Sequence, residues 1–198
     1  MSTSSQGDPV DRYHHGDLRR ALVEEGLELL AENGYDGFSL RELARRVGVT
    51  ANASYRHFAN KEALMQALAS EGFRRLSAAQ LRAEAQAGDG STLLAGGRSY
   101  IRFAHDNPAL FRLMFSVIPP QRRDDELHEA SRKAFETLRE AVARDWPGVK
   151  PDPKRVTRTA LRAWALVHGL GQLLLDGQLD GLEEDPLGLA EAVLADTV

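Results

Sequence analysis

The side chains of this sequence that could do chemistry gather in one short stretch, GVTANASYRHFANKEAL at residues 48–64. Its centre, residues 50–54, has only short side chains, and hydrogen-bonding and cationic side chains follow directly. A helix that enters the DNA major groove, about 12 Å wide, needs short side chains at its front and hydrogen-bond donors at its flanks. Because a helix of this composition has little apolar surface to bury, we interpret it as one that fills a DNA groove.

The individual side chains suit different parts of a DNA duplex. Asn52 can bond an adenine edge with both ends of its amide, and Ala51 or Ala53 can contact a thymine methyl group. Arg41 or Arg56 can reach a guanine or a phosphate. The side chains expected to hold the DNA backbone are Tyr55, His57 and Lys61.

Two short helices and a tight turn would position these side chains. Apolar residues recur at positions 40, 43, 44 and 47, the spacing of one helix face, and Ser39 can cap the start of that helix. Gly48 can end it in the left-handed conformation, and Thr50 can cap a second helix that runs to about Phe58. This arrangement is typical of a helix-turn-helix. A solvated surface helix is the alternative, but turn, short helices and local positive charge coincide here and argue against it.

The rest of the chain also follows helical periodicity, and no stretch alternates for long enough to predict a sheet. We therefore predict an all-α protein. Asn60 can cap a long helix, and the sequence AQAGDGS near residue 85 marks a change in composition. The predicted organisation is a disordered tail at residues 1–12, a three-helix DNA-binding domain at 13–60, a connecting helix at 61–85 and a second helical domain at 86–198.

Composition excludes several classes of function. The chain has no cysteine, which excludes disulfides, thiolate catalysis and cysteine-ligated metals. No run of about 18 apolar residues and no secretory signal is visible, so we expect no membrane contact and a cytoplasmic location. His14 and His15 beside Asp17 could suggest a metal site, but adjacent histidines in a polar lead-in rarely converge on one ion. No nucleophile with a base and no cofactor loop is found, so we expect no metal, no cofactor and no enzymatic activity.

The stretch from about residue 13 to residue 75 resembles the TetR-type transcriptional regulators. The resemblance is carried by YHHGDLRRAL, GYDGFSLRELARRVGVT and ASYRHFANKEAL. It implies contacts to bases or to the groove from Arg41, Ala51 and Asn52. It implies phosphate contacts from Thr50, Tyr55, His57 and Lys61. Arg56 stands where the family varies, and Ser54 stands where the family usually has a leucine that packs the recognition helix onto the first helix.

The C-terminal half resembles a TetR C-terminal domain type named for a tryptophan, a histidine and a glycine. SYIRFAHDNPALFRLMFS and RAWALVHGLGQLLLDG carry this resemblance, with Trp164, His168 and Gly169 at the named positions. It implies that residues 86–198 bind a small effector and that the chain forms a homodimer through its last two helices. The side chains that could line the pocket, or simply fill a core, are Phe103, Leu110, Phe111, Met114, Phe115, Phe135, Trp164 and His168. For His168 two roles stay open, a buried structural imidazole or a contact to the effector.

Together these observations predict a sequence-specific, DNA-binding transcriptional regulator. We expect a repressor that is released from a palindromic double-stranded operator by a small, largely apolar effector. The alternative is a helical small-molecule-binding or scaffolding module that binds no operator. A net charge of −4 argues against a protein that coats nucleic acid without selectivity.

Overall fold

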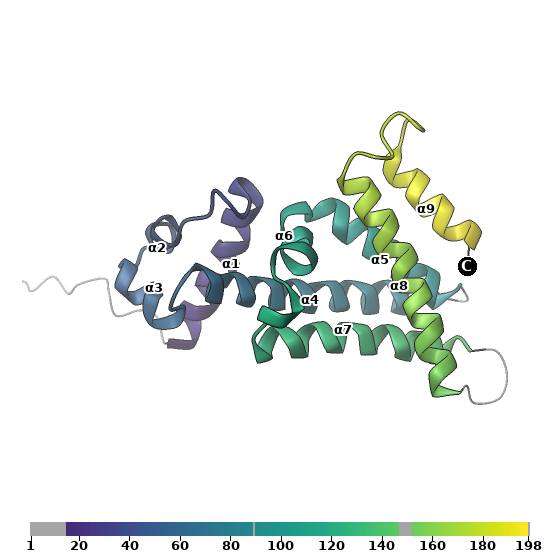
Figure 1. Cartoon of the computed structure of the whole chain (residues 1–198), viewed down its shortest axis with the longest axis horizontal. Coiled ribbons are helices and arrows are strands. Elements are labelled where there is room, and N and C mark those ends of the chain that lie inside the picture. The colour runs from purple at the N-terminus through teal and green to yellow at the C-terminus, as the bar shows by residue number, and fades with distance from the viewer. Residues whose placement is uncertain (1–14, 89, 147–151, 198) are drawn as a thin grey trace, which may run out of the picture. The chain divides into compact units, whose positions relative to one another are not determined.

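The computed structural model describes residues 15–88, 90–146 and 152–197, and within these ranges its regular elements are helices (Figure 1). The all-α prediction is therefore confirmed. The predicted tail at 1–12 and His14 lie outside the described residues. By its internal contacts the chain divides into two units, residues 1–64 and 65–198, and it passes from one to the other within helix α4, Lys61–Gln86.

The first unit contains three helices before α4 begins, namely α1 His15–Asn33, α2 Leu40–Val47 and α3 Ala51–His57. The predicted caps explain where the short helices start and stop. The Thr50 hydroxyl accepts a hydrogen bond from the Ala53 amide at 3.2 Å and so begins α3. Gly48, with φ of 76°, ends α2 and donates its amide to the last carbonyls of that helix. A residue with a Cβ would be strained in this left-handed conformation, which is why the turn contains glycine.

The core of the first unit lies where α1, α2 and α3 meet. The largest fully buried side chains there are Leu22, Leu29, Leu30 and Leu43, and Phe58 closes the end of α3. Arg46 on α2 holds this packing from outside, because its guanidinium donates to Glu32 at 2.9 Å and to Glu25 at 3.4 Å, both on α1. The buried leucines hold α1 and α2 together, and α3 packs in turn on α2.

The second unit is a helical bundle made from the remainder of α4 and the elements that follow it. These are α5 Thr92–Asp106, α6 Pro108–Arg112, the π-helix η2 Leu113–Val117, the 3-10 helix η3 Pro120–Arg122, α7 Asp125–Arg144, α8 Pro153–Leu175 and α9 Pro186–Thr197. α5 packs on α8 and α9, and α8 also packs on α7 and α9.

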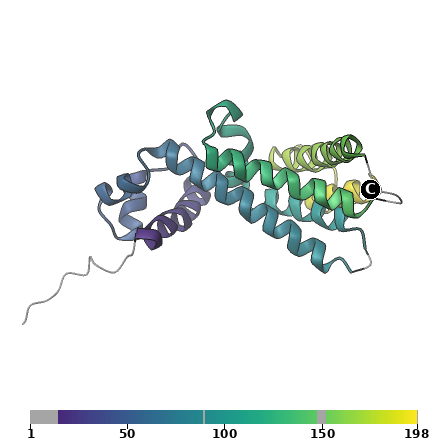
Figure 2. The same ribbon diagram turned by 90° about the horizontal axis from the view of Figure 1, so that it is seen from below.

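α4 and α7 run side by side in the same direction in both views (Figures 1 and 2). Two ion pairs join them, one between Arg74 and Glu126 at 3.2 Å and one between Arg144 and Glu84. α8 crosses this pair, so its apolar sides are covered by α5 and α7, as its continuous apolar sequence requires. None of the helices, over the ranges described, is long and apolar enough to cross a membrane.

Candidate DNA-reading surface and effector cavity

The outward side of α3 carries the side chains that could read DNA. Asn52, Tyr55 and Arg56 are exposed, and their spacing of three and four residues places them on one face of the helix. Thr50 is exposed at the start of the helix, and Ala51 and His57 are half-buried. Their contacts with DNA stay predictions.

The positive charge of α2 is smaller than its sequence suggests. Arg45 pairs with Glu42 at 2.6 Å, and Arg46 is engaged by Glu42, Glu32 and Glu25. Hydrogen bonds from Arg45 and then Arg46 lower the pKa of Glu42 to about 2, so this carboxylate stays charged and neutralises its neighbours.

Two cationic side chains that the structure describes on this surface remain unpaired, one on α2 and one on α3. Within the described ranges, Arg41 and Arg56 are exposed and make no ion pair. Arg41 also lines a shallow hollow together with Tyr55 and Lys61. The structure thus brings together one residue each from α2, α3 and the start of α4, all three predicted to contact DNA.

Lys61 has a structural role that the sequence did not reveal. Its ammonium donates to the carbonyl of Tyr35 at 2.5 Å and lies 4.4 Å from the centre of the Tyr35 ring. The loop between α1 and α2 is therefore fastened to the first residue of α4. An ammonium has three donors, so a phosphate contact is still compatible with this arrangement.

Ser54 occupies the position where the family resemblance leads one to expect leucine. Its side chain is 1% exposed, on the side of α3 opposite to the exposed face, and its hydroxyl has no hydrogen-bond partner. A buried hydroxyl without a partner costs free energy, roughly 1–3 kcal/mol. The contact between α3 and its neighbours therefore forms around a small polar side chain, in place of a larger apolar one.

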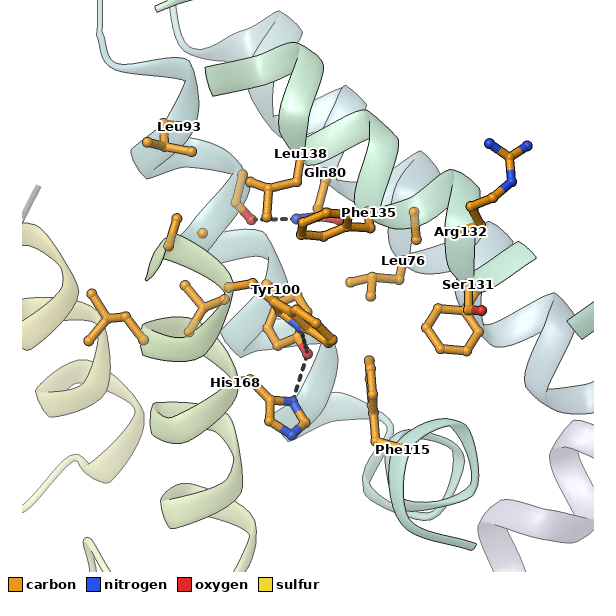
Figure 3. Close-up of a pocket in the computed structure, with 18 of the residues that line it drawn as sticks. Leu76, Gln80, Leu93, Tyr100, Phe115, Ser131, Arg132, Phe135, Leu138 and His168 are labelled. Carbon is orange, nitrogen blue, oxygen red and sulfur yellow. Dashed lines mark hydrogen bonds between the residues drawn. The ribbon is translucent and has the colours of Figure 1, made fainter. Parts of the chain in front are cut away.

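The second unit encloses a cavity of about 990 Å³. Figure 3 shows side chains from α4, η2 and α7 around the same space, among them Leu76, Phe115 and Phe135. Leu138 and Trp164 add to the apolar wall. A volume of this size, walled mainly by apolar and aromatic groups with a few polar ones, suits a drug-sized molecule.

A chain of hydrogen bonds runs along one wall of the cavity. The Trp164 indole donates to the hydroxyl of Tyr100 at 3.3 Å, and this hydroxyl lies 2.9 Å from Nδ1 of His168 (Figure 3). Because an indole N–H can only donate, the arrangement that satisfies all three groups has Tyr100 donating to His168. Burial raises the pKa of Tyr100 and lowers the pKa of His168, so both side chains are held neutral.

The residues predicted to line the effector pocket divide into two groups. The residues of the first group, which line the cavity, are Phe115, Phe135, Trp164 and His168. The residues of the second group, which are buried but do not line it, are Phe103, Leu110, Phe111 and Met114. Phe111 instead stacks on the His168 ring with centroids 5.5 Å apart.

Sequence reasoning missed most of the face of α7, where it offered only Phe135 as a candidate. His128, Ser131, Arg132, Phe135 and Leu138 line the cavity. Their spacing of three and four residues is a helical face, which was visible as a pattern but did not indicate an open space behind it. Within the described part of the chain, no three side chains of the metal-binding types meet in a cluster.

Known proteins share both halves of this architecture. Residues 22–68 match the family model of bacterial regulatory proteins of the tetR family, and residues 93–197 match the model of the tetracyclin repressor-like C-terminal domain. The class D tetracycline repressor protein of Escherichia coli is 34% identical over 94 residues, which are 48% of this chain and 38% of that protein. The chain therefore matches less than half the length of this curated relative.

Solved structures agree over nearly the whole length. A protein of unknown function from Rhodococcus sp. RHA1 is 34% identical with a TM-score of 0.77, and the match covers 94% of this chain and 96% of that one. A TetR variant from Acinetobacter baumannii AYE in complex with minocycline has a TM-score of 0.57 at 20% identity, covering 88% and 90% of the two chains, which shows a shared fold. Since the C-terminal model alone spans more than half of the sequence, this chain belongs to the tetR family of bacterial regulatory proteins.

Proposed function

We propose that this chain is a homodimeric transcriptional repressor that binds a palindromic operator and leaves it when a small molecule enters the cavity of the second unit. The observation that carries the proposal is the exposed face of α3, which contains Asn52, Tyr55 and Arg56. This helix begins at its cap Thr50, directly after the turn at Gly48. In this proposal residues 13–60 bind DNA, 61–85 connect, and 86–198 bind the effector and the second protomer. The proposed repressor acts in the cytoplasm, where bacterial DNA is located.

The DNA contacts fall into two classes. Arg41, Ala51 and Asn52 read bases or the groove, and Arg56 adds a base or phosphate contact. Thr50, Tyr55, His57 and Lys61 hold phosphates. The exposure of Asn52 supports the first class, and the hollow that Arg41 shares with Tyr55 and Lys61 supports an anchoring point for the backbone beside it.

Selection of operators from random DNA, followed by footprinting, tests this division. Asn52→Ala should relax the preference at one or two base positions, because it removes a bidentate contact of about 1–3 kcal/mol. Lys61→Ala should weaken binding to specific and random DNA alike and lower the salt slope by about one, because one phosphate is no longer neutralised. A footprint without dyad symmetry, or identical behaviour of both variants, would contradict the proposal.

The proposed dimer face is the outward side of α8 and α9. Leu161 is 51% exposed, Leu173 44% and Val193 40%, while the small Ala165 and Gly169 between the leucines leave room for a close approach. One recognition helix reads few base pairs, and two-fold pairing doubles them. A second copy of the chain is thus the partner that this face requires.

Sedimentation at micromolar concentration tests the dimer. Leu173→Glu should shift the protein toward monomer, because it places a charge in an apolar interface. Leu81→Glu is the matched control, since Leu81 is 47% exposed but lies on α4, away from the last two helices. A monomeric wild type, or equal effects of both substitutions, would contradict this interface.

A second candidate function is a helical small-molecule-binding protein without an operator. The cavity supports it, because all of its wall belongs to residues 73–194 and none to the DNA-reading unit. If compounds bind with high affinity while selection yields no operator, this candidate replaces the regulator.

A further inference from the structure

Arg123 is a charged side chain in the cavity wall that the proposed function does not yet use. It follows η3 directly, and it lines the cavity beside Phe73 and Phe115. Its Nη2 donates to the carbonyl of Met114 at 2.9 Å, and its guanidinium lies 5.8 Å from the centre of the Phe73 ring. These two contacts hold the guanidinium in place without neutralising it.

No acidic residue in the described part of the chain pairs with Arg123. Among the described residues, its buried Nε has no hydrogen-bond partner, and none is found for Nη1 either. Desolvation by burial lowers the pKa of Arg123, and no carboxylate acts against this effect. An arginine stays charged nonetheless, so the wall of the cavity carries a partly dehydrated positive charge.

Over the described ranges, the other ionic groups of the wall have partners, with the exception of Asp125. Arg132 pairs with Glu129 at 2.7 Å, and the buried carboxylate of Glu84 pairs with the half-exposed Arg144. Asp125 is exposed in the first turn of α7, where the helix dipole favours a carboxylate. Within the described part of the chain, Arg123 is therefore the charged group of the wall that is partly buried and has no counter-charge.

The other side chains of the wall determine which kind of ligand can bind beside the charge of Arg123. Phe73, Phe115, Phe135 and Trp164 offer aromatic faces, and Leu138 adds an aliphatic one. A planar guanidinium matches the geometry of a carboxylate, and a charge-assisted hydrogen bond is about twice as strong as a neutral one. A molecule that satisfies both features has an apolar, aromatic body and one carboxylate.

We propose that the cavity selects aromatic carboxylates, with Arg123 as the residue that binds the carboxylate. This inference deepens the proposed function, because it names the chemical class of the effector. Arg123 thereby becomes the specificity-determining residue of the cavity. Its bond to the Met114 carbonyl also connects the carboxylate to η2, the π-helix whose Phe115 lines the same space.

Direct binding to the purified full chain, without DNA, tests this inference. The probes are 1-pyrenebutyrate and 4-biphenylbutyrate, each compared with its primary amide and with the amine of the same body. In each series the carboxylate should bind the wild type at least about tenfold more tightly than the amide, because only the carboxylate gains a charge-assisted bond. The amine should bind more weakly still.

Substitutions of Arg123 and Arg132 distinguish a specific role of Arg123 from a general effect of positive charge in the cavity wall. Arg123→Met should lower carboxylate affinity about tenfold or more and leave amide affinity within about twofold, whereas Arg123→Lys should retain part of the preference. Arg132→Met is the matched control, because Arg132 also lines the cavity but is paired and points away from the other labelled side chains (Figure 3). It should leave all affinities within about twofold. Thermal unfolding of each variant checks that the fold is kept.

Amides that bind as tightly as carboxylates, probes that do not bind, or an equal loss of all ligands in Arg123→Met would overturn the inference. If Arg123→Met does not fold, Arg123→Lys carries the same test, because lysine keeps the charge but not the planar geometry of the guanidinium. A reduced preference for the carboxylate would then support the inference, and an unchanged preference would overturn it. The proposal of a transcriptional regulator is contradicted by different results from those that overturn this inference. If the chain binds carboxylates through Arg123 but selects no operator, the repressor proposal is wrong. If it selects an operator but prefers neutral ligands, the repressor proposal stands and carboxylates are excluded as the effector class.

Discussion

At the scale of single residues, Ser54 is the position where the sequence and its environment disagree. The hydroxyl is buried and unpartnered. Ser54→Ala should therefore raise the free energy of unfolding by about 1 kcal/mol, because it removes the unsatisfied group and alanine has the higher helix propensity. Urea denaturation measures this change, and DNA affinity should stay within about threefold, since Ser54 does not lie on the exposed face of α3.

Ser70 provides the comparison for that measurement. It is equally buried, but its hydroxyl donates to the Gln66 carbonyl at 2.9 Å. Ser70→Ala removes a satisfied hydrogen bond, so it should be neutral or destabilising by up to about 1 kcal/mol. A loss of stability in Ser54→Ala as large as that in Ser70→Ala would show that the Ser54 hydroxyl is satisfied after all.

His168 should make stability depend on pH. Its pKa is lowered from 6.5 by burial among neutral rings, so the folded state prefers the uncharged imidazole. Protonation of Nδ1 would also leave the Tyr100 hydroxyl without its acceptor. The contribution of this group is complete above pH 6.5, where folded and unfolded states are both neutral, and it is lost as the pH falls below that value.

The measurement is the urea midpoint at pH 7.5 and at pH 5.5, for the wild type and for His168→Gln. The wild type should lose more stability between the two pH values than the variant does, although the variant is less stable at pH 7.5. Equal losses would mean that the buried imidazole titrates as it does in water, and would favour a solvent-exposed contact role for His168 over a structural one.

At the scale of elements, α4 and η2 approach each other at a glycine. A Cβ at Gly72 would lie 2.6 Å from Sδ of Met114 and 3.0 Å from a methyl group of Leu110. Gly72→Ala should cost about 1–3 kcal/mol by overpacking, against about 1 kcal/mol gained in helix propensity, so a net loss of up to about 2 kcal/mol is expected.

A double-mutant cycle in urea shows whether Met114 is the cause. Met114→Ala alone should cost about 2–5 kcal/mol through the cavity that it leaves. In the double variant the added methyl group has room, so its cost should be clearly below the sum of the two single changes. Additive costs would place the strain elsewhere, and η2 would then be independent of α4 at this point.

The elements themselves were well predicted because their signals are local. The stripe at positions 40, 43, 44 and 47, with Ser39 before it and Gly48 after it, gave α2 its observed bounds. Partners distant in sequence left no such signal. Arg46 contributes to the local positive charge of the sequence, and only folding brings it to Glu25 and Glu32 on α1.

The same limit applies to the cavity. Helical periodicity identifies apolar faces, but it does not say which apolar side chains border a space and which fill the core. Phe111 and Met114 are 0% exposed, whereas Phe115, one turn later, lines the cavity. Met114 and Phe115 lie in a π-helix from Leu113 to Val117, whereas the sequence ALFRLMFS predicted a short apolar helix that did not distinguish core from cavity positions.

At the scale of the whole molecule, one helix belongs to both units. α4 begins with Lys61, which fastens the loop before α2, and continues past Gly72 and Leu76 in the second unit. A ligand that alters the packing of α4 in the second unit therefore acts on an element whose first turn belongs to the DNA-reading unit. Such coupling requires two conformations that the ligand binds with different affinity.

The effects of effector and operator on each other's affinity must be equal. If a carboxylate effector lowers operator affinity a hundredfold, its binding must differ by about 2.7 kcal/mol between the two conformations, within the usual range of allosteric coupling. Operator DNA must then weaken effector affinity by the same factor of a hundred. Titration of the effector with and without saturating operator DNA measures this factor. A scrambled duplex of equal length is the control, because this duplex has the same phosphate charge but lacks the specific contacts. Equal effector affinities with operator, with scrambled duplex and without DNA would mean that the cavity and the recognition helices are not coupled, and release by effector would be excluded even if both bind their ligands.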